Sequence, residues 1–431
     1  MIIVTATSSG HLPRAMVMAK SAKTHMPDCK VIVGLMERHI PSEAFSYPYF
    51  DEIVLFQDLH FFPNFNKFIF QYSVVEAGGA GKAQILKYAF EKYTEEEQFV
   101  YLDTDMKVLG PFAEIFDLFR HYSIILTPHL IHSPDPFDPG YLKTVKYYGI
   151  NNAGFIGVKR DNSSAGFIDW WIRRIEHDGY LNDEHFGDQT WIDLVPSYFD
   201  RVHILRHPGY NFAFWNYHQR TLSLDEEQHF LAEGLPLRCV HFSCYNTLYM
   251  SSMHYLPERQ QQLLMQLRDE YEAELNEEDK AMLHGLEWSY NCFYDGTTIE
   301  RESKKVYRTR YFNDPAIDDP FALSNDFFKT SDELDEEPHE EALADGQQAS
   351  RTAGAKRRAA RKTRRVRAKK AKKLRSAAKS VKTAKRRKTL KKSKRTVPRK
   401  KLQANRKTRR RTAGRVSLNA RGMWESKVSG G

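Results

Sequence analysis

The sequence predicts an α/β fold, a sheet flanked by helices, followed by a disordered basic tail. Three observations lead to this prediction. Strand-like and helix-like segments alternate in the first hundred residues, as they do in βαβ units. An apolar strand over residues 99–102 ends abruptly at two aspartates. From residue 351 onward the chain is rich in Lys, Arg and Ala, and it lacks the large apolar residues that would offset chain entropy.

The alternation begins with a strand over 1–5, a polar turn, and a helix over 12–22 that shows apolar periodicity. Two more strands are expected over 31–36 and 53–56, and an amphipathic helix over about 82–92 precedes the strand that ends at the aspartates. The remaining expected elements are strands over 123–127 and 155–158, a helix over 165–176, a strand ending at 241, and a helix over 257–278. Parallel sheets of this kind gather their ligands at the carboxyl ends of the strands.

The net charge of +10 is unevenly distributed. Residues 351–431 hold 35 of the 65 Lys and Arg residues and one of the 55 acidic residues, Glu425, so they carry +34. The first 350 residues carry −24. We therefore expect three parts: a globular domain over 1–312, an acidic linker over 313–350, and the basic tail over 351–431.

The cysteines and the N-terminal segment bear on the compartment. The four cysteines have no metal-site or redox spacing and suit a reducing compartment, as small buried apolar residues. The chain starts with a strand-like run and lacks the basic and long apolar regions of a signal peptide. No stretch approaches the length of a transmembrane helix. We expect a cytoplasmic protein, with a peripheral position at the inner membrane face as a further option.

Asp103 and Asp105 are the first candidate site. On a regular strand, an i, i+2 spacing places both side chains on one face. The two carboxylates repel each other and resist burial, so a hard cation such as Mg²⁺ or Mn²⁺, shared with substrate phosphates, would make the arrangement favourable. The alternative is a capping or turn pair, because Asp favours both positions. Gly110 and Pro111 then break the pattern, and a helix is expected to begin at Pro111.

Further segments along the chain, taken together with the two aspartates, resemble those of a known protein family. In chain order they are DTD (103–105), NNAGFIGV (151–158), DWW (169–171), DQTWIDLVP (188–196), PGYNFAFWN (208–216) and HFS (241–243). Together they resemble bacterial retaining glycosyltransferases of the GT-A fold, which use an Asp-x-Asp motif and a late histidine. The resemblance covers about residues 1–300. It implies a GT-A-type, Rossmann-like mixed sheet flanked by helices, and hexosyl transfer from a nucleoside-diphosphate sugar, with UDP-sugar preferred.

The resemblance implies a metal centre made of Asp103, Asp105 and His241. These residues would hold Mn²⁺ or Mg²⁺, and Asp103 would also lie near the sugar or ribose. The cation would neutralise the charge that develops on the leaving diphosphate. The alternative for His241 is an ordinary histidine at the end of a strand.

The same resemblance implies contacts with the nucleotide-sugar donor. Ala6 and Thr7 match the loop after the first strand, which meets the uridine and ribose. Lys82 matches a basic residue that could contact the donor, and its alternative is a surface lysine. Asn152 and Ala153 match a contact with the donor sugar.

Asp188 and Gln189 are the expected catalytic residues. By resemblance they lie near the anomeric carbon, where Asp188 would orient the sugar hydroxyls or the emerging cation. The chain departs from the family at Cys244, where Gly is common, and at Thr247, where Lys is common. Gly would let a backbone N–H approach the diphosphate, and Lys would add charge. The departures bear on how the phosphates are bound.

Other functions remain open from the sequence. The acceptor could be a glycan, a lipid or a protein. A polyanion-binding protein with a catalytically silent scaffold is the main alternative, because the tail could bind nucleic acid, an anionic membrane or a cell-wall polymer. The tail could also be a solubilising extension, and its near lack of aromatics beyond Trp424 argues against base stacking. Nucleotidyl transfer would need a more glycine-rich loop than residues 7–10.

Overall fold

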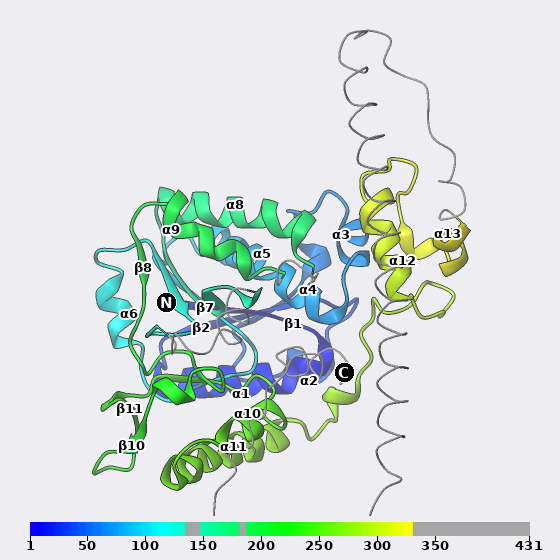
Figure 1. Cartoon of the computed structure of the whole chain (residues 1–431). Coiled ribbons are helices and arrows are strands. Elements are labelled where there is room, and N and C mark those ends of the chain that lie inside the picture. Colours follow the sequence, from blue (N-terminus) through cyan, green and yellow to red (C-terminus); the bar gives the residue numbers. More distant parts are fainter. Residues whose placement is uncertain (134–146, 181–186, 331–431) are drawn as a thin grey trace, which may run out of the picture. The chain divides into compact units, whose positions relative to one another are not determined.

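The computed structural model describes residues 1–133, 147–180 and 187–330. At its centre is a seven-stranded mixed sheet with the strand order β3-β2-β1-β4-β7-β6-β8 (Figure 1). Strands β3, β2, β1 and β4 run parallel, and β7 is antiparallel to both of its neighbours. The bounds are β1 (Ile2–Thr7), β2 (Lys30–Leu35), β3 (Glu52–Leu55), β4 (Gln98–Leu102), β6 (Ile124–Pro128), β7 (Asn151–Lys159) and β8 (Val202–Ile204). The predicted mixed sheet is confirmed.

Helices cover both faces of this sheet, as the sequence predicts. Helices α5 (Lys82–Lys92) and α8 (Asn162–Asp178) lie on one face, and α1 (Leu12–His25) lies on the other (Figure 1). The alternation of side chains along a strand divides the core: Ile2 and Val4 of β1 pack in the layer with α5, whereas Ile3 packs in the layer with α1. A capping box of Asp161 and Ser164 starts α8.

A smaller sheet adjoins the main one. It has the strand order β5-β13-β9, with β5 (Met106–Val108), β9 (Phe212–Ala213) and β13 (Cys239–His241). Only residues 103–105 separate β4 from β5, so the chain passes from one sheet to the other at the aspartates. Helices α10 (Leu248–Met253) and α11 (Glu258–Glu278) share a core with this sheet, and α11 contacts α1. A third sheet consists of β10 (Leu222–Leu224), β11 (Phe230–Ala232) and β12 (Leu235–Pro236).

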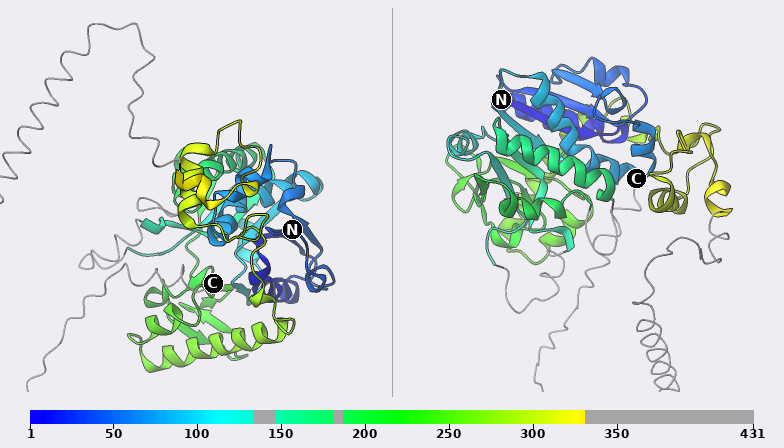
Figure 2. Two further views of the ribbon diagram at one scale, coloured as in Figure 1. Left: turned by 90° about the vertical axis from the view of Figure 1, so that its right-hand side faces the viewer. Right: turned by 90° about the horizontal axis from the view of Figure 1, so that it is seen from above.

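The segment after α11 packs in the layer of the core that contains α5. Helices α12 (Arg301–Val306) and α13 (Asn325–Thr330) lie near α3 (Phe65–Phe70), as the two views of Figure 2 show. The rings of Phe321 and Phe328 pack on Phe70, with centroids 5.0 and 5.6 Å away. Residues up to 330 thus contribute to the core, although the expected linker starts at 313. The rest of that linker and the tail lie outside the described residues.

Several element boundaries differ from the prediction. Helix α5 has the predicted bounds, but the helix expected at Pro111 begins two residues later as α6 (Ala113–Leu118). The other helices are α2 (Ser42–Phe45), α4 (Val74–Ala80) and α9 (Val195–Tyr198). Across the described ranges, no helix is both long and apolar enough to cross a membrane.

Candidate metal and donor site

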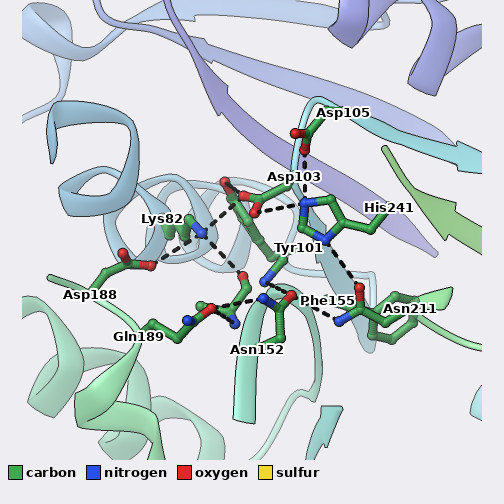
Figure 3. A network of polar contacts seen from close by, with 12 residues as sticks. Lys82, Tyr101, Asp103, Asp105, Asn152, Phe155, Asp188, Gln189, Asn211 and His241 are labelled. Atoms are coloured by element: carbon green, nitrogen blue, oxygen red, sulfur yellow. Dashed lines mark hydrogen bonds and ion pairs between the residues drawn. The ribbon is translucent and has the colours of Figure 1, made fainter. Parts of the chain in front are cut away.

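Asp103, Asp105 and His241 meet at the carboxyl end of β4 (Figure 3). Nε2 of His241 lies 2.9 Å from Oδ1 of Asp105 and 3.8 Å from Oδ2 of Asp103. One possible ligand atom from each residue lies within 4.8 Å of the other two. The pairing of β13 with β5 brings the histidine there, since His241 stands opposite Met106. Residues more than a hundred positions apart in the sequence thus form one compact cluster.

The two carboxylates converge through a turn, and not through the side-chain alternation of a regular strand from which their common face was predicted. β4 ends at Leu102, and the N–H of Met106 closes the turn by donating to the carbonyl of Asp103 at 3.2 Å. The N–H of Asp103 donates to the carbonyl of Gly154 at 2.9 Å, and the N–H of Phe242 donates to that of Asp105 at 2.8 Å. The turn is therefore fixed from both sheets, and it directs the aspartates by loop geometry.

A bulge in β7 forms the floor of the cluster. The pairing with β6 shifts so that Leu126 faces Ile156 while Thr127 faces Asn152, which leaves residues 153–155 outside the regular register. A Cβ at Gly154 would lie 2.6 Å from Cε1 of His241 and 2.9 Å from Oδ2 of Asp103. Only glycine fits this position without displacing the candidate metal ligands.

Lys82, at the start of α5, links the cluster to Asp188. Its Nζ lies 2.9 Å from Oδ1 of Asp103 and 3.1 Å from Oδ2 of Asp188, and it donates to the carbonyl of Ala153 at 3.4 Å. Burial disfavours the charge, but the two carboxylates outweigh it and raise the pKa of Lys82 above its ordinary value. Lys82 is buried rather than the surface lysine of the alternative. It thus forms ion pairs with two carboxylates and a long hydrogen bond with a backbone carbonyl.

Asp188 and Gln189 lie side by side next to Lys82, and both are buried. The indole N–H of Trp171 donates to the backbone carbonyl of Asp188 at 3.1 Å, which anchors this residue to α8. A Cβ at Gly79 of α4 would lie 2.5 Å from Oδ1 of Asp188, so the helix approaches the carboxylate closely because glycine stands there. The amide of Gln189 bonds to neighbouring protein groups.

The expected donor-binding residues lie around the same edge. Ala6 and Thr7 end β1, which runs parallel to β4 with Val4 opposite Tyr101, so their backbone reaches the level of the aspartates. Asn152 and Ala153 lie in the bulge of β7. All the residues that the sequence assigns to the site therefore lie in one neighbourhood. It consists of the carboxyl ends of β1 and β4, the β7 bulge, and the segments that pack against them.

Two polar residues of this neighbourhood were missed by the sequence prediction. The hydroxyl of Tyr101 donates to Oδ1 of Asp103 at 3.0 Å, although its position in an apolar run predicts only core packing. Oδ1 of Asn211 lies 3.1 Å from Nδ1 of His241. Asn211 belongs to the PGYNFAFWN segment, and the Pro-Gly before it signals a turn, but nothing local indicates a contact with residue 241.

Cys244 has a backbone conformation that suits glycine. Its φ is 53°, in the left-handed region that side chains other than Gly, Asn and Asp rarely adopt. The departure at this position therefore changes the side chain and leaves the loop conformation that suits glycine.

The donor atoms fit a divalent cation. Two carboxylates and one imidazole offer oxygen and nitrogen ligand atoms that lie within 4.8 Å of one another, and Gly154 adds no side chain beside them. The aspartate side chains are partly exposed, at 24% and 14%, so the site is open to a ligand on one side. Carboxylate oxygens are ligands that both Mn²⁺ and Mg²⁺ accept.

Comparison with known proteins gives relatives over part of the chain. No protein-family model matches it. The uncharacterized protein YfnF of Bacillus subtilis (strain 168) is 29% identical over 167 residues, which is 38% of this chain and 55% of that protein. YfnD of the same organism is 27% identical over 168 residues, which is 38% of this chain and 51% of that protein. The chain spans about half the length of these curated relatives.

Several solved structures to which this chain is similar are glycosyltransferases. The galactosyltransferase LgtC is 15% identical with a TM-score of 0.32, covering 60% of this chain and 98% of that one. GlyE of Streptococcus pneumoniae TIGR4 is 16% identical with a TM-score of 0.36, covering 65% and 64%. A glycosyltransferase involved in glycosylation of the major capsid of PBCV-1 is 12% identical with a TM-score of 0.33, covering 56% and 93%. At these scores the likeness carries no argument about activity.

Proposed function

We propose that this chain is a metal-dependent glycosyltransferase that moves a hexosyl group from a nucleoside-diphosphate sugar, a UDP-sugar in the first instance, to an acceptor hydroxyl. The observation that carries the proposal is the convergence of Asp103, Asp105 and His241. Carboxylates drawn together at a half-buried edge repel each other unless a cation offsets their charge. The neighbouring pair of Lys82 and Asp188 adds a second polar centre directly beside the first.

The chemistry of sugar transfer gives each group a role. Breaking the bond between the sugar and the diphosphate builds negative charge on the leaving oxygen. A divalent cation held by the two aspartates and His241 would act there as a Lewis acid. Fixed electrostatic stabilisation of this kind is commonly the largest single contribution to catalysis. The ends of β1 and the bulge of β7 would receive the nucleotide and the sugar.

Asp188 and Lys82 act as a pair in this proposal. Lys82 holds the carboxylate of Asp188 beside Asp103, so that Asp188 can orient the sugar hydroxyls or face the positive charge that develops on the sugar ring. Nζ of Lys82 lies within ion-pair distance of both carboxylates, so it can hold them in place while it also faces the donor. Gln189 keeps the backbone at Ala153 in place. We assign no nucleophile, and retention of configuration rests on the family resemblance alone.

The test is a screen of UDP-sugars for hydrolysis and transfer that depend on Mn²⁺, with the full chain and a double variant, Asp103→Asn with Asp105→Asn. We expect the variant to lose at least about 10³-fold in rate, because it replaces two negatively charged carboxylate ligands of the cation with neutral amides. Asp117→Asn is the matched control, since Asp117 is 76% exposed and pairs with Arg120 on the surface. An unchanged rate in the double variant would refute the metal assignment.

The charge of the tail favours a second, independent function. Residues 351–431 carry +34, a density typical of segments that bind polyanions through counterion release. In this proposal the tail is a separate part that attaches the enzyme to nucleic acid, an anionic membrane or a cell-wall polymer. Binding should weaken steeply with salt and vanish when residues 351–431 are removed. Salt-independent binding would exclude electrostatic attachment.

A further inference from the structure

We propose that a relay of three side-chain amides, those of Gln189, Asn152 and Asn211, fixes the ring proton of His241 on Nδ1 and so presents the lone pair of Nε2 to the cation. Asn211 is the positioning residue that contacts the histidine. The inference rests on the proposed function, because it takes His241 to be a metal ligand. It goes beyond that function because it assigns a role to Asn211. It also states that the three amides all point their hydrogen-bond donors in the same direction along the relay (Figure 3).

The relay starts at backbone groups whose roles cannot be reversed. The carbonyl of Tyr148 can only accept, and Nε2 of Gln189 lies 2.6 Å from it. The N–H of Ala153 can only donate, and Oε1 of Gln189 accepts it at 3.0 Å. These two contacts determine which way the amide of Gln189 points. Oε1 therefore faces the next amide in the relay as an acceptor.

Asn152 passes the same polarity on. Its Nδ2 donates to Oε1 of Gln189 at 2.9 Å, and its Oδ1 accepts the N–H of Gly154 at 3.0 Å. A flipped amide would place nitrogen against the Gly154 N–H and oxygen against Oε1, so both contacts would become repulsive. The carbonyl end of Asn152 thus faces Asn211.

Asn211 completes the relay. Its Nδ2 donates to Oδ1 of Asn152 and to Oγ1 of Thr127, both at 2.9 Å. Its Oδ1 is then left to face Nδ1 of His241 at 3.1 Å, and this oxygen can only accept. Nδ1 must therefore carry the proton. In the neutral ring, Nε2 keeps its lone pair, and it is Nε2 that lies beside the two aspartates.

The backbone of Asn211 is held as firmly as its side chain. The residue is fully buried, and its φ of 49° lies in the left-handed region, which Asn tolerates better than most residues. Its N–H donates to Sγ of Cys239 at 3.3 Å, and its carbonyl accepts from Nδ2 of Asn216 at 3.0 Å. A partner that orients a metal-binding histidine through its second nitrogen commonly changes metal affinity about 10–100-fold when removed.

The experiment measures the affinity of the full chain for Mn²⁺ by calorimetry, for the wild type and two variants. Asn211→Gly suits the positive φ but removes the amide, and we expect about a 10–100-fold weaker affinity. Asn211→Asp keeps an oxygen acceptor against Nδ1 and gives up the amide donors, so we expect it to retain the affinity with some loss of stability. Circular dichroism and thermal melts establish that each variant is folded at the temperature of the titration.

The outcomes separate this inference from the proposed function. If Asn211→Gly binds Mn²⁺ as tightly as the wild type, or if Asn211→Asp weakens as much as Asn211→Gly, the relay does not set the histidine and the inference is overturned, while the metal site stands. If the wild-type chain binds no Mn²⁺, the proposed metal site fails and the relay falls with it.

Discussion

Lys82 and Lys304 are both buried lysines, with 7% and 6% of their surface exposed, but they lie in regions of different character. Nζ of Lys82 contacts the carboxylates of Asp103 and Asp188, whereas Nζ of Lys304 in α12 donates to the backbone carbonyl of Tyr72 at 2.6 Å. Burial opposes the charge of both. The two carboxylates nevertheless raise the pKa of Lys82, while the pKa of Lys304 is lowered to about 8. Burial alone therefore does not decide the charge of a lysine here.

The comparison shows what distinguishes the candidate site from the aromatic core around it. Near Lys304, the ring of Trp288 lies 4.9 Å from Nζ, and Glu76 raises the pKa without cancelling the effect of burial. In that region, burial lowers the pKa of the lysine. At the end of β4, the lysine instead keeps its charge, because two carboxylates balance it.

Replacing Lys82 by Met should have the largest effect. It leaves the carboxylates of Asp103 and Asp188 together without a cation, and breaking a buried pair in this way commonly costs about 3–5 kcal/mol. Urea unfolding at neutral pH measures the loss in the free energy of unfolding. Lys304→Met is the matched control, and it should cost far less or stabilise the protein. Equal losses in the two variants would refute the claim that the two buried lysines differ in how their charge is balanced.

The pH dependence of stability should separate the two lysines next. The pKa of Lys304 is about 8 in the folded chain, against 10.5 in the unfolded one. Between these pH values the unfolded chain binds more protons than the folded chain. The contribution of Lys304 to the free energy of unfolding therefore rises with pH across this window. From about pH 7 to about pH 10, we expect the free energy of unfolding of the wild type to rise by about 2 kcal/mol relative to that of Lys304→Met. Unfolding both proteins at the two pH values measures this gain, and a constant difference between them would contradict the assignment.

Gly154→Ala should give a smaller loss, and it changes space rather than charge. The new methyl group would lie 2.6 Å from Cε1 of His241 and 2.7 Å from Oδ1 of Asn152, and overpacking of this kind typically costs about 1–3 kcal/mol. The affinity for Mn²⁺ should fall with it. Gly78→Ala in α4 is the control, because nothing lies within 4 Å of a Cβ there. It should be neutral or stabilising, since Ala favours a helix by up to about 1 kcal/mol over Gly. A Gly154→Ala variant with unchanged stability and affinity would show that the bulge is not tightly packed.

Local patterns in the sequence accounted for much of the fold. The apolar strand that stops at Asp103 and the amphipathic pattern of α5 are both signals within a few neighbouring residues, and both elements formed where expected. The path of the chain at the aspartates was not predictable in this way. It depends on the pairing of β5 with β13, between residues more than a hundred positions apart.

The parts of the site that the sequence did not reveal share a physical cause. The role of Asn211 depends on a positive φ and on the orientation of three amides, and that of Gly154 depends on how close His241 comes. Tyr101 looked like a core residue, and it is one, but its hydroxyl reaches Asp103. Each of these depends on contacts made only after the sheets have assembled, so no spacing in the sequence encodes them.

The most direct test of the central claim is the electron spin echo envelope modulation of Mn²⁺ bound to the full chain, since it detects nitrogen coordinated to the ion. We expect the wild type to show a nitrogen modulation typical of one imidazole, and His241→Ala to lose it. Bound Mn²⁺ without that modulation in the wild type, or with the same modulation in His241→Ala, would contradict the central claim.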